Sequence, residues 1–518
     1  MSRPSGGGWR RVLPAVHPGV ALLLVALALR LPGFGNPVLD VDEEFYLLVG
    51  DRLLHGALPF VDIWDRKPAG LFLIYAAIRL LGGTGILQYQ LVATLSAAAT
   101  ATVIARIARR FAPGRGAILA GVAYLLWLDV LGGQGGQSPV FYNLPVALAA
   151  LLTLGAVTGA PTPSRLRRQG CAVMLLTGLA MQIKYTAVFE GVFFGCALLL
   201  AARRGGAGPG RLAANAAAWI GCALLPTALV LGFFVAIGQG GAFAYANFVS
   251  IFQRSAPEDG SSLVRLGKMA AYLAPLAICA VLSRWPHRPA AIAARAEAAA
   301  AQGFVVAWAG ASVAGVLVFG TYYNHYALPM LVPLAAAAAP LLATADPRRA
   351  LRAAFAQPSA VTAGHALRLG FPLLALFAAL VTGLVMHRHH LRNRGDGSQV
   401  RAIADYLRPR LHDCLFIFEG EPILYHLTGS CLATRYAFPS HLADAKEAGA
   451  TGVVPEEEVA RILGTRPEFV LSDDAPLPRS NRRSWAVALE ALEQNYHPVL
   501  RVQVGKRQRV LYRRNDAG

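Results

Sequence analysis

Long apolar segments dominate this chain and restrict its fold more than any other feature. Apolar runs of about 16–26 residues recur between positions 12 and 386, and a helix of about 20 apolar residues spans the hydrocarbon core of a bilayer. Charged residues make up 15% of the chain, against about 25% in soluble domains. The sequence predicts an α-helical polytopic membrane protein with about 11 spans plus juxtamembrane helices. The expected spans are 13–33, 86–105, 116–132, 140–159, 170–187, 189–202, 212–237, 268–284, 302–320, 326–344 and 369–386.

The charge distribution orients these spans. The net charge is +19; residues 1–386 contribute 29 basic and 13 acidic side chains, and residues 387–518 contribute 19 and 16. Basic residues such as Arg106, Arg109 and Arg110 lie in short connections, as expected of cytoplasmic loops. This predicts a cytoplasmic N-terminus and an extracytoplasmic C-terminus. The bias toward Ala, Gly, Pro and Arg indicates a bacterial genome rich in GC, so the expected location is a bacterial inner membrane with the C-terminus in the periplasm. No basic stripe with interleaved aromatic residues is present, so nucleic acid is not an expected partner.

The segment 68–83 is apolar but short, and Arg79 interrupts it. If this segment crossed the membrane, every later basic cluster would move to the outer face, against the positive-inside rule. We therefore predict a juxtamembrane or re-entrant helix over 68–83, preceded by a first periplasmic loop over 34–67. The transmembrane domain is expected to comprise residues 1–386.

The remaining residues, 387–518, have the pattern of a small soluble α/β domain. Helical patterns cover 398–410, 421–429 and 454–465, and short apolar runs typical of strands cover 414–420, 468–473, 497–505 and 507–514. Cys414 and Cys431 lie in this domain. They could form a disulfide if the domain faces an oxidising compartment, or remain as two free thiols.

The first loop gathers seven of the 13 acidic residues of positions 1–386 between positions 40 and 65. In its DVDEEFY stretch, Asp42, Glu43 and Tyr46 follow the end of a span, and on a helix Glu43 and Tyr46 share a face while Asp42 points elsewhere. One carboxylate could take a proton from a hydroxyl, and its neighbour could raise its pKa or help to hold a metal. The alternative is a solvated helix start in which acids favour the dipole.

A second motif in the same loop, DIWDRKP, combines acids with cations. Asp62 and Asp65 are three residues apart and precede Arg66 and Lys67. Phosphate groups are bound by such cations. The alternative is that Arg66 and Lys67 reach lipid headgroups from the start of a juxtamembrane helix.

Three further positions near the outer ends of predicted spans carry polar side chains. Lys184 could bind a phosphate or pair with Glu190, because an isolated ammonium near the membrane is unfavourable. Asp129 could contact a sugar or a cation, or be an ordinary interfacial acid. His325 lies in a tyrosine-rich turn beside Tyr326, where an aromatic belt is an equally good explanation.

The first loop resembles that of the GT-C membrane glycosyltransferases, in the branch that includes protein O-mannosyltransferases (glycosyltransferase family 39) and the lipid A aminoarabinose transferase. The resemblance covers residues 13–345 loosely and is specific in the first loop. It rests on an acid pair, a tyrosine, later acids and a Lys-Pro pair, followed by a lysine at a span end and a late His-Tyr turn. These residues are Asp42, Glu43, Tyr46, Asp62, Asp65, Lys67, Pro68, Lys184, His325 and Tyr326.

The resemblance implies an enzyme that moves a sugar from a polyprenyl-phosphate donor, with inversion, to a lipid, glycan or protein hydroxyl. Asp42 or Glu43 would be the base, Lys67, Arg66 and Lys184 would meet the donor phosphate, and Tyr46, Asp62, Asp65, Asp129, His325 and Tyr326 would line the substrate site. Relatives often carry a second acid in the loop after the third span, but here that loop offers Gln134 and Gln137. No metal or other cofactor is therefore expected. The alternatives are a flippase for polyprenyl-linked lipids and a non-catalytic subunit of an envelope-glycan pathway.

Overall fold

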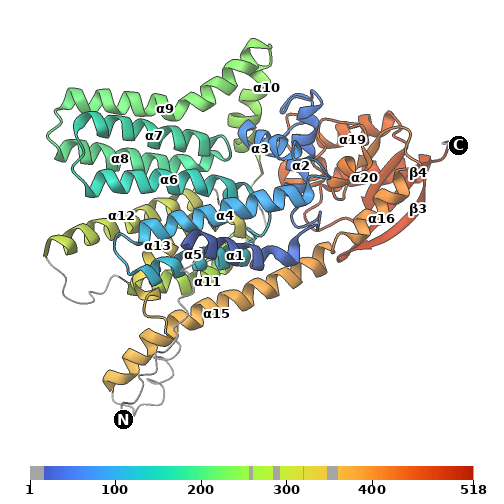
Figure 1. Ribbon diagram of the computed structural model, residues 1–518. Coiled ribbons are helices and arrows are strands. Elements are labelled where there is room, and N and C mark those ends of the chain that lie inside the picture. The colour runs from blue at the N-terminus through green and yellow to red at the C-terminus, as the bar shows by residue number, and fades with distance from the viewer. Residues whose placement is uncertain (1–16, 256–260, 284–291, 319, 347–359, 517–518) are drawn as a thin grey trace, which may run out of the picture.

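The computed structural model describes residues 17–255, 261–283, 292–318, 320–346 and 360–516. Long helices lie side by side in the larger part of the molecule, and a smaller domain with a β-sheet lies at one end (Figure 1). The helices of the larger part are α1 (Pro18–Arg30), α2 (Val41–Leu54), α3 (Ala69–Arg79), α4 (Ile86–Ala108), α5 (Gly114–Val130), α6 (Ser138–Thr158), α7 (Pro163–Met181), α8 (Val188–Arg204), α9 (Pro209–Ala236), α10 (Gly240–Ala244), α11 (Ser261–Leu282), α12 (Ile292–Leu317), α13 (Leu331–Leu342) and α15 (Ala360–Arg394).

The polytopic helical fold predicted from the sequence is confirmed. Eight helical segments of the described residues are long and apolar enough to cross a membrane, and each overlaps a predicted span. The other three predicted spans, 13–33, 116–132 and 170–187, also contain helices, α1, α5 and α7, which are shorter or more polar; residues 13–16 lie outside the described residues. Helix α3 has 11 residues and rises about 16 Å, roughly half the core thickness, which favours a juxtamembrane position.

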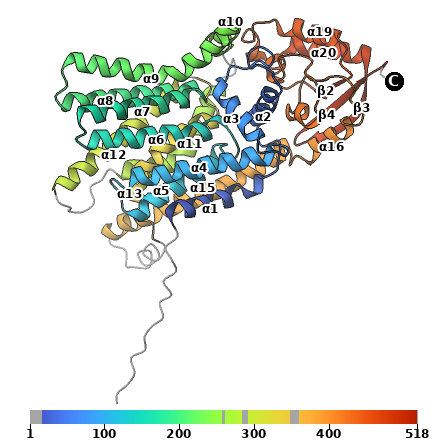
Figure 2. The same ribbon diagram turned by 45° about the horizontal axis from the view of Figure 1, so that its top comes forward.

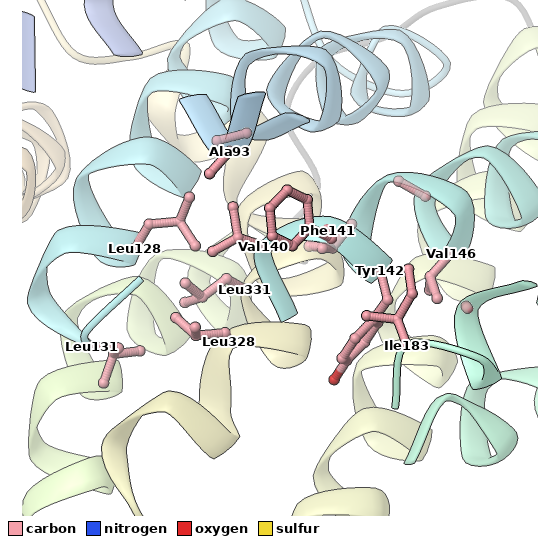
Figure 3. Packing of buried hydrophobic residues seen from close by; sticks show 14 of the residues in the cluster. Ala93, Leu128, Leu131, Val140, Phe141, Tyr142, Val146, Ile183, Leu328 and Leu331 are labelled. Carbon is pink, nitrogen blue, oxygen red and sulfur yellow. The ribbon is translucent and has the colours of Figure 1, made fainter. Parts of the chain in front are cut away.

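Small residues bring the helices close together. A Cβ on Gly121 of α5 would meet the carbonyl oxygen of Ala101 in α4, and a Cβ on Gly178 of α7 would meet that of Ala223 in α9. Such close approach maximises dispersion contacts between membrane helices, where the hydrophobic effect contributes little. Figure 3 shows the same principle around Ala93, whose small side chain lies beside larger ones from α5 and α6.

The C-terminal domain contains a four-stranded sheet of order β1-β2-β4-β3, made of β1 (Leu415–Ile417), β2 (Phe469–Asp473), β3 (Tyr496–Val504) and β4 (Arg507–Arg514). Strands β1 and β2 are parallel, and β4 is antiparallel to both β2 and β3. Its helices are α16 (Ser398–Leu407), α17 (Ile423–Thr428), α18 (Ser440–Ala443), α19 (Pro455–Gly464) and α20 (Arg482–Asn495). Every helix and strand expected in this domain is present, and Cys414 and Cys431 form a disulfide.

Three elements of this region differ from the sequence-based expectation: the end of α15, and the helices α18 and α20, which were not predicted. The last predicted span ends at 386, but α15 continues to Arg394, because the polar stretch that follows ends the apolar run without ending the helix. The continued helix enters the C-terminal domain (Figure 1). Helix α20 was not predicted, although Asn481 caps it by accepting hydrogen bonds from the amides of Arg483 and Ser484.

Helices α2 and α3 lie between the helical bundle and the C-terminal domain (Figure 2). The backbone amide of Trp64 donates to the carbonyl of Arg435 over 2.8 Å, and the amide of Ile423 donates to the Glu44 carboxylate over 3.4 Å. The ring of Phe45 packs edge-on against Phe438 with centroids 5.2 Å apart. The first loop is thus held between two layers, where Glu43, Glu44 and Asp65 are shielded from water.

Candidate active site

The start of α2 separates its two candidate bases. Asp40 caps the helix, since its side chain accepts a hydrogen bond from the Asp42 amide over 3.0 Å. Asp42 is half-buried, and its electrostatic neighbours are Lys67, His325, Lys184 and Arg394. Glu43 is 1% exposed and faces the loop after α5. Of the two carboxylates, Asp42 is the one that lies among basic groups and remains open to solvent.

Lys67 is held beside Asp42 by the turn that precedes α3. The carboxylate of Asp65 accepts hydrogen bonds from the backbone amides of Arg66 (2.5 Å) and Lys67 (3.1 Å), which fixes the turn. The ammonium of Lys67 lies 5.2 Å from the centroid of the Tyr46 ring, a cation–π contact. Asp65 and Tyr46 therefore position the lysine.

The charges of Asp42 and Lys67 stabilise each other. Burial raises the pKa of Asp42, but Lys67 above all, together with other basic groups, leaves that pKa below its ordinary value. Burial likewise lowers the pKa of Lys67, and the carboxylates of Asp42 and Asp65 more than offset this, so the pKa is raised. At neutral pH the site thus holds a carboxylate and an ammonium side by side.

Two tyrosines after α12, Tyr323 and Tyr326, contact further cationic side chains near the same site. The ammonium of Lys184 lies 4.5 Å from the ring centroid of Tyr326. The guanidinium of Arg265 lies 4.9 Å from the ring of Tyr323, and Lys446 donates a hydrogen bond to the Tyr323 hydroxyl. Sequence analysis had selected Lys184 and Tyr326 but missed Arg265 and Lys446, which come from distant parts of the chain.

His325 stands between the tyrosines and the carboxylate. Its ring packs edge-on against Tyr326, with centroids 4.9 Å apart, and lies parallel to the ring of Tyr323 at 5.9 Å. It is also an electrostatic neighbour of Asp42. The structure therefore brings Asp42, Lys67, Lys184, His325 and Tyr326 together, from four separate segments.

Arg66 points away from this group, although it is the immediate neighbour of Lys67. Its guanidinium is 2.5 Å from the carboxylate of Glu447 in the C-terminal domain, and the other oxygen of Glu447 is 2.5 Å from Arg254. Burial raises the pKa of Glu447, but these two arginines lower it to about 2. Glu447 is thus ionised, and it ties the first loop and the segment after α10 to the C-terminal domain.

Two other predicted site residues also lie elsewhere. Asp62 is exposed, and its carboxylate accepts a hydrogen bond from the Leu58 amide over 2.7 Å, so it caps a turn. Asp129 is buried near Arg30, a residue that sequence analysis did not select. Arg30 donates hydrogen bonds to the carbonyls of Gly133 (2.5 Å) and Gly135 (3.4 Å). These contacts order the loop after α5.

Glu43 lies against this ordered loop. A Cβ on Gly135 would clash with its carboxylate, and Oε2 of Glu43 has no hydrogen-bond partner among the described residues. Burial, and then the charge of Asp40, raise the pKa of Glu43 to about 8. Glu43 is therefore mostly protonated at pH 7 and is a poor base, which leaves Asp42 as the candidate.

Replacing Glu43 by glutamine should flatten the pH dependence of stability. A glutamate whose pKa rises from 4.5 to about 8 on folding binds more protons in the folded state across that range, so stability falls as pH rises, by up to about 1.4 kcal/mol per pH unit. Thermal unfolding of wild type and Glu43→Gln between pH 5 and 8 measures the slope. The exposed control Glu457→Gln should behave as wild type; equal slopes for wild type and Glu43→Gln would contradict the assignment.

The described residues contain one group with metal-ligand spacing, Asp413 with Cys414 and Cys431. The two sulfurs are bonded to each other, so they are not available as thiolate ligands. Around Asp42 the neighbouring groups are cationic, which disfavours a second cation. The residues at this site fit an anionic ligand better than a metal ion.

Several solved structures share this architecture. ArnT from Cupriavidus metallidurans bound to undecaprenyl phosphate superposes with a TM-score of 0.61 at 16% identity, covering 95% of this chain and 97% of that chain. The apo oligosaccharyltransferase of Archaeoglobus fulgidus gives 0.55 at 11% identity, covering 96% and 81%. The protein has the GT-C fold. This GT-C chain matches no family model and no curated protein by sequence.

Proposed function

We propose that this protein transfers a sugar from a polyprenyl-phosphate carrier to a hydroxyl of a lipid, glycan or protein, with inversion, at the periplasmic face of a bacterial inner membrane. The observation that carries the proposal is the meeting of one ionised carboxylate, Asp42, with the ammonium groups of Lys67 and Lys184. The ArnT structure with undecaprenyl phosphate supports a lipid phosphate as the anion for a chain of this fold.

Each group has a role in this reaction. Asp42 takes the proton of the acceptor hydroxyl, while the oxygen of that hydroxyl bonds to the anomeric carbon of the sugar. The bond between that carbon and the phosphate oxygen breaks, and polyprenyl phosphate leaves. Lys67 and Lys184 stabilise the negative charge that develops on the leaving phosphate. No step in this scheme requires a metal ion.

The test is transfer by the purified protein in lipid nanodiscs, using undecaprenyl-phosphate hexoses and pentoses radiolabelled in the sugar and a bacterial lipid and glycan extract as acceptor. We expect label to move from the carrier into the extract with at least one of these donors. Failure to bind undecaprenyl phosphate, together with no transfer from any donor, would refute the proposal.

Lys184→Met should weaken the binding of undecaprenyl phosphate about ten-fold, because a hydrogen bond to a charged group contributes about 1.5 kcal/mol. The affinity can be measured with radiolabelled undecaprenyl phosphate in nanodiscs. Lys506→Met, which removes an exposed lysine between β3 and β4, is the matched control. Unchanged affinity in Lys184→Met would remove this lysine from the donor site.

A further inference from the structure

A polar cavity of about 250 Å³ borders the start of α2. Val41 and Glu44 of α2 form one wall, Arg394 at the end of α15 forms another, and the C-terminal domain closes it with residues that include Glu419 and Arg507. Three separate parts of the chain therefore build this cavity. Among its lining residues, Arg394 is also an electrostatic neighbour of Asp42.

Two arginines of this cavity are loosely paired. Arg479 lies 3.7 Å from Asp444, and Arg507 lies 3.6 Å from Asp473, both too long for hydrogen bonds. Their side chains are 58% and 33% exposed. In contrast, Arg509 is buried and bonded to both Glu421 and Asp473. Arg509 therefore serves as a scaffold, while Arg479 and Arg507 can turn toward an anion.

Glu419 contributes a carboxylate to the same cavity. Its side chain is 6% exposed, and Oε1 accepts a hydrogen bond from the Ser480 hydroxyl over 2.8 Å. Oε2 has no hydrogen-bond partner in the part of the chain that the structure describes. Oε2 is enclosed by protein, and Asp473 and Trp485 lie close to this carboxylate. A ligand hydroxyl would therefore meet Glu419 at Oε1, beside Ser480, which lines the same cavity.

The cavity is physically connected to the Asp42 site. Arg394 lines the cavity, and its guanidinium lies 3.5 Å from the carboxylate of Asp40. The same Asp40 side chain accepts a hydrogen bond from the backbone amide of Asp42 over 3.0 Å. A molecule in the cavity that contacts Arg394 would therefore be connected to the proposed base, Asp42, through Asp40.

We propose that this cavity binds an anionic saccharide of the acceptor, with its phosphate or carboxylate at Arg479 and Arg507 and a sugar hydroxyl at Glu419. Mixed donors and acceptors suit a carbohydrate, whose hydroxyls serve as both. Arginine suits the anion because its planar group can form two parallel hydrogen bonds. This inference rests on the proposed transferase function, since it assigns the acceptor side of that reaction.

The test is saturation-transfer NMR on the full-length protein in lipid nanodiscs, with glucose 6-phosphate, glucuronate and glucose as probes. We expect the phosphate or the carboxylate probe to bind at least ten-fold more tightly than glucose. The double variant Arg479→Ala/Arg507→Ala should abolish this preference, and Ser440→Trp, which fills the cavity from α18, should reduce binding of both anionic probes at least ten-fold. Arg483→Ala, on an exposed residue of the same domain, is the control.

The comparison of the two anionic probes decides between phosphorylated and carboxylated acceptors. Correct folding of each variant is checked by its retained affinity for undecaprenyl phosphate. The inference is overturned if neither anionic probe binds wild type, or if their binding survives Ser440→Trp. Lys67→Met separates the two proposals, because it should weaken undecaprenyl phosphate binding and transfer while leaving saccharide binding intact. Saccharide binding by a wild-type protein that neither binds undecaprenyl phosphate nor transfers a sugar would refute the transferase and not the cavity.

Discussion

Asp42→Asn should lower kcat for sugar transfer by about 10²–10⁴-fold, the range expected when a general base is lost. Asparagine matches the size of aspartate but cannot accept the proton. Because the helix cap uses Asp40 and the backbone amide of Asp42, the substitution should leave α2 in place. Affinity for undecaprenyl phosphate should persist or increase, since a negative charge beside Lys67 is removed.

Two matched variants make this result specific. Asp62→Asn changes an exposed acid of the same loop and should keep near wild-type kcat. Glu43→Gln replaces a group that is already mostly protonated at pH 7, so its rate there should fall far less than that of Asp42→Asn. Full activity in Asp42→Asn, or equal losses in all three variants, would exclude Asp42 as the base.

The same experiment separates the enzyme from its rivals. When the protein is reconstituted in liposomes, a flippase would move labelled lipid across the membrane without breaking the sugar–phosphate bond. This activity should survive Asp42→Asn. A non-catalytic subunit would bind undecaprenyl phosphate and release no labelled sugar in any variant. Release of polyprenyl phosphate that depends on Asp42 is predicted by the transferase alone.

Hydropathy and short-range signals were sufficient for most of the fold. The long apolar runs predicted the helical bundle because a segment that crosses the hydrocarbon core must be apolar, must be about 20 residues long, and must satisfy its backbone hydrogen bonds internally. Gly429 marked the end of α17, where it adopts the left-handed conformation, φ 69°. The end of α15 was missed because composition reports where the apolar environment ends and carries little information on where a helix ends.

The predicted topology and the family resemblance, rather than closeness in sequence, allowed the residues of the site to be selected. Asp42, Lys67, Lys184 and Tyr326 do converge, but Arg66 instead meets Glu447, 381 positions away. Spacing within one loop cannot reveal which domain a side chain will face. Arg30 escaped notice for a related reason: it ends an apolar helix, where arginine commonly reaches lipid headgroups, and its carbonyl partners lie more than 100 positions away.

Lys67→Met should reduce kcat/KM by about 10²–10³-fold, corresponding to about 3–4 kcal/mol of lost stabilisation of the leaving phosphate. The structure gives this lysine two functions. Its ammonium is held beside Asp42 by the Asp65 turn, and it is the largest favourable influence on the Asp42 charge. Its removal should therefore raise the pKa of Asp42 and move the acidic limb of the rate profile to higher pH.

This pH shift distinguishes a role in the site from a structural one. Lys67→Arg keeps the positive charge and should retain the wild-type acidic limb even if its rate is lower, whereas Lys506→Met should match wild type in both rate and profile. A variant that merely loosened the loop would lose rate without moving the limb. An unshifted profile in a well-folded Lys67→Met protein would mean that Asp42 is not the titrating base. It would also refute the proposal that Asp42 and Lys67 act as a pair in catalysis.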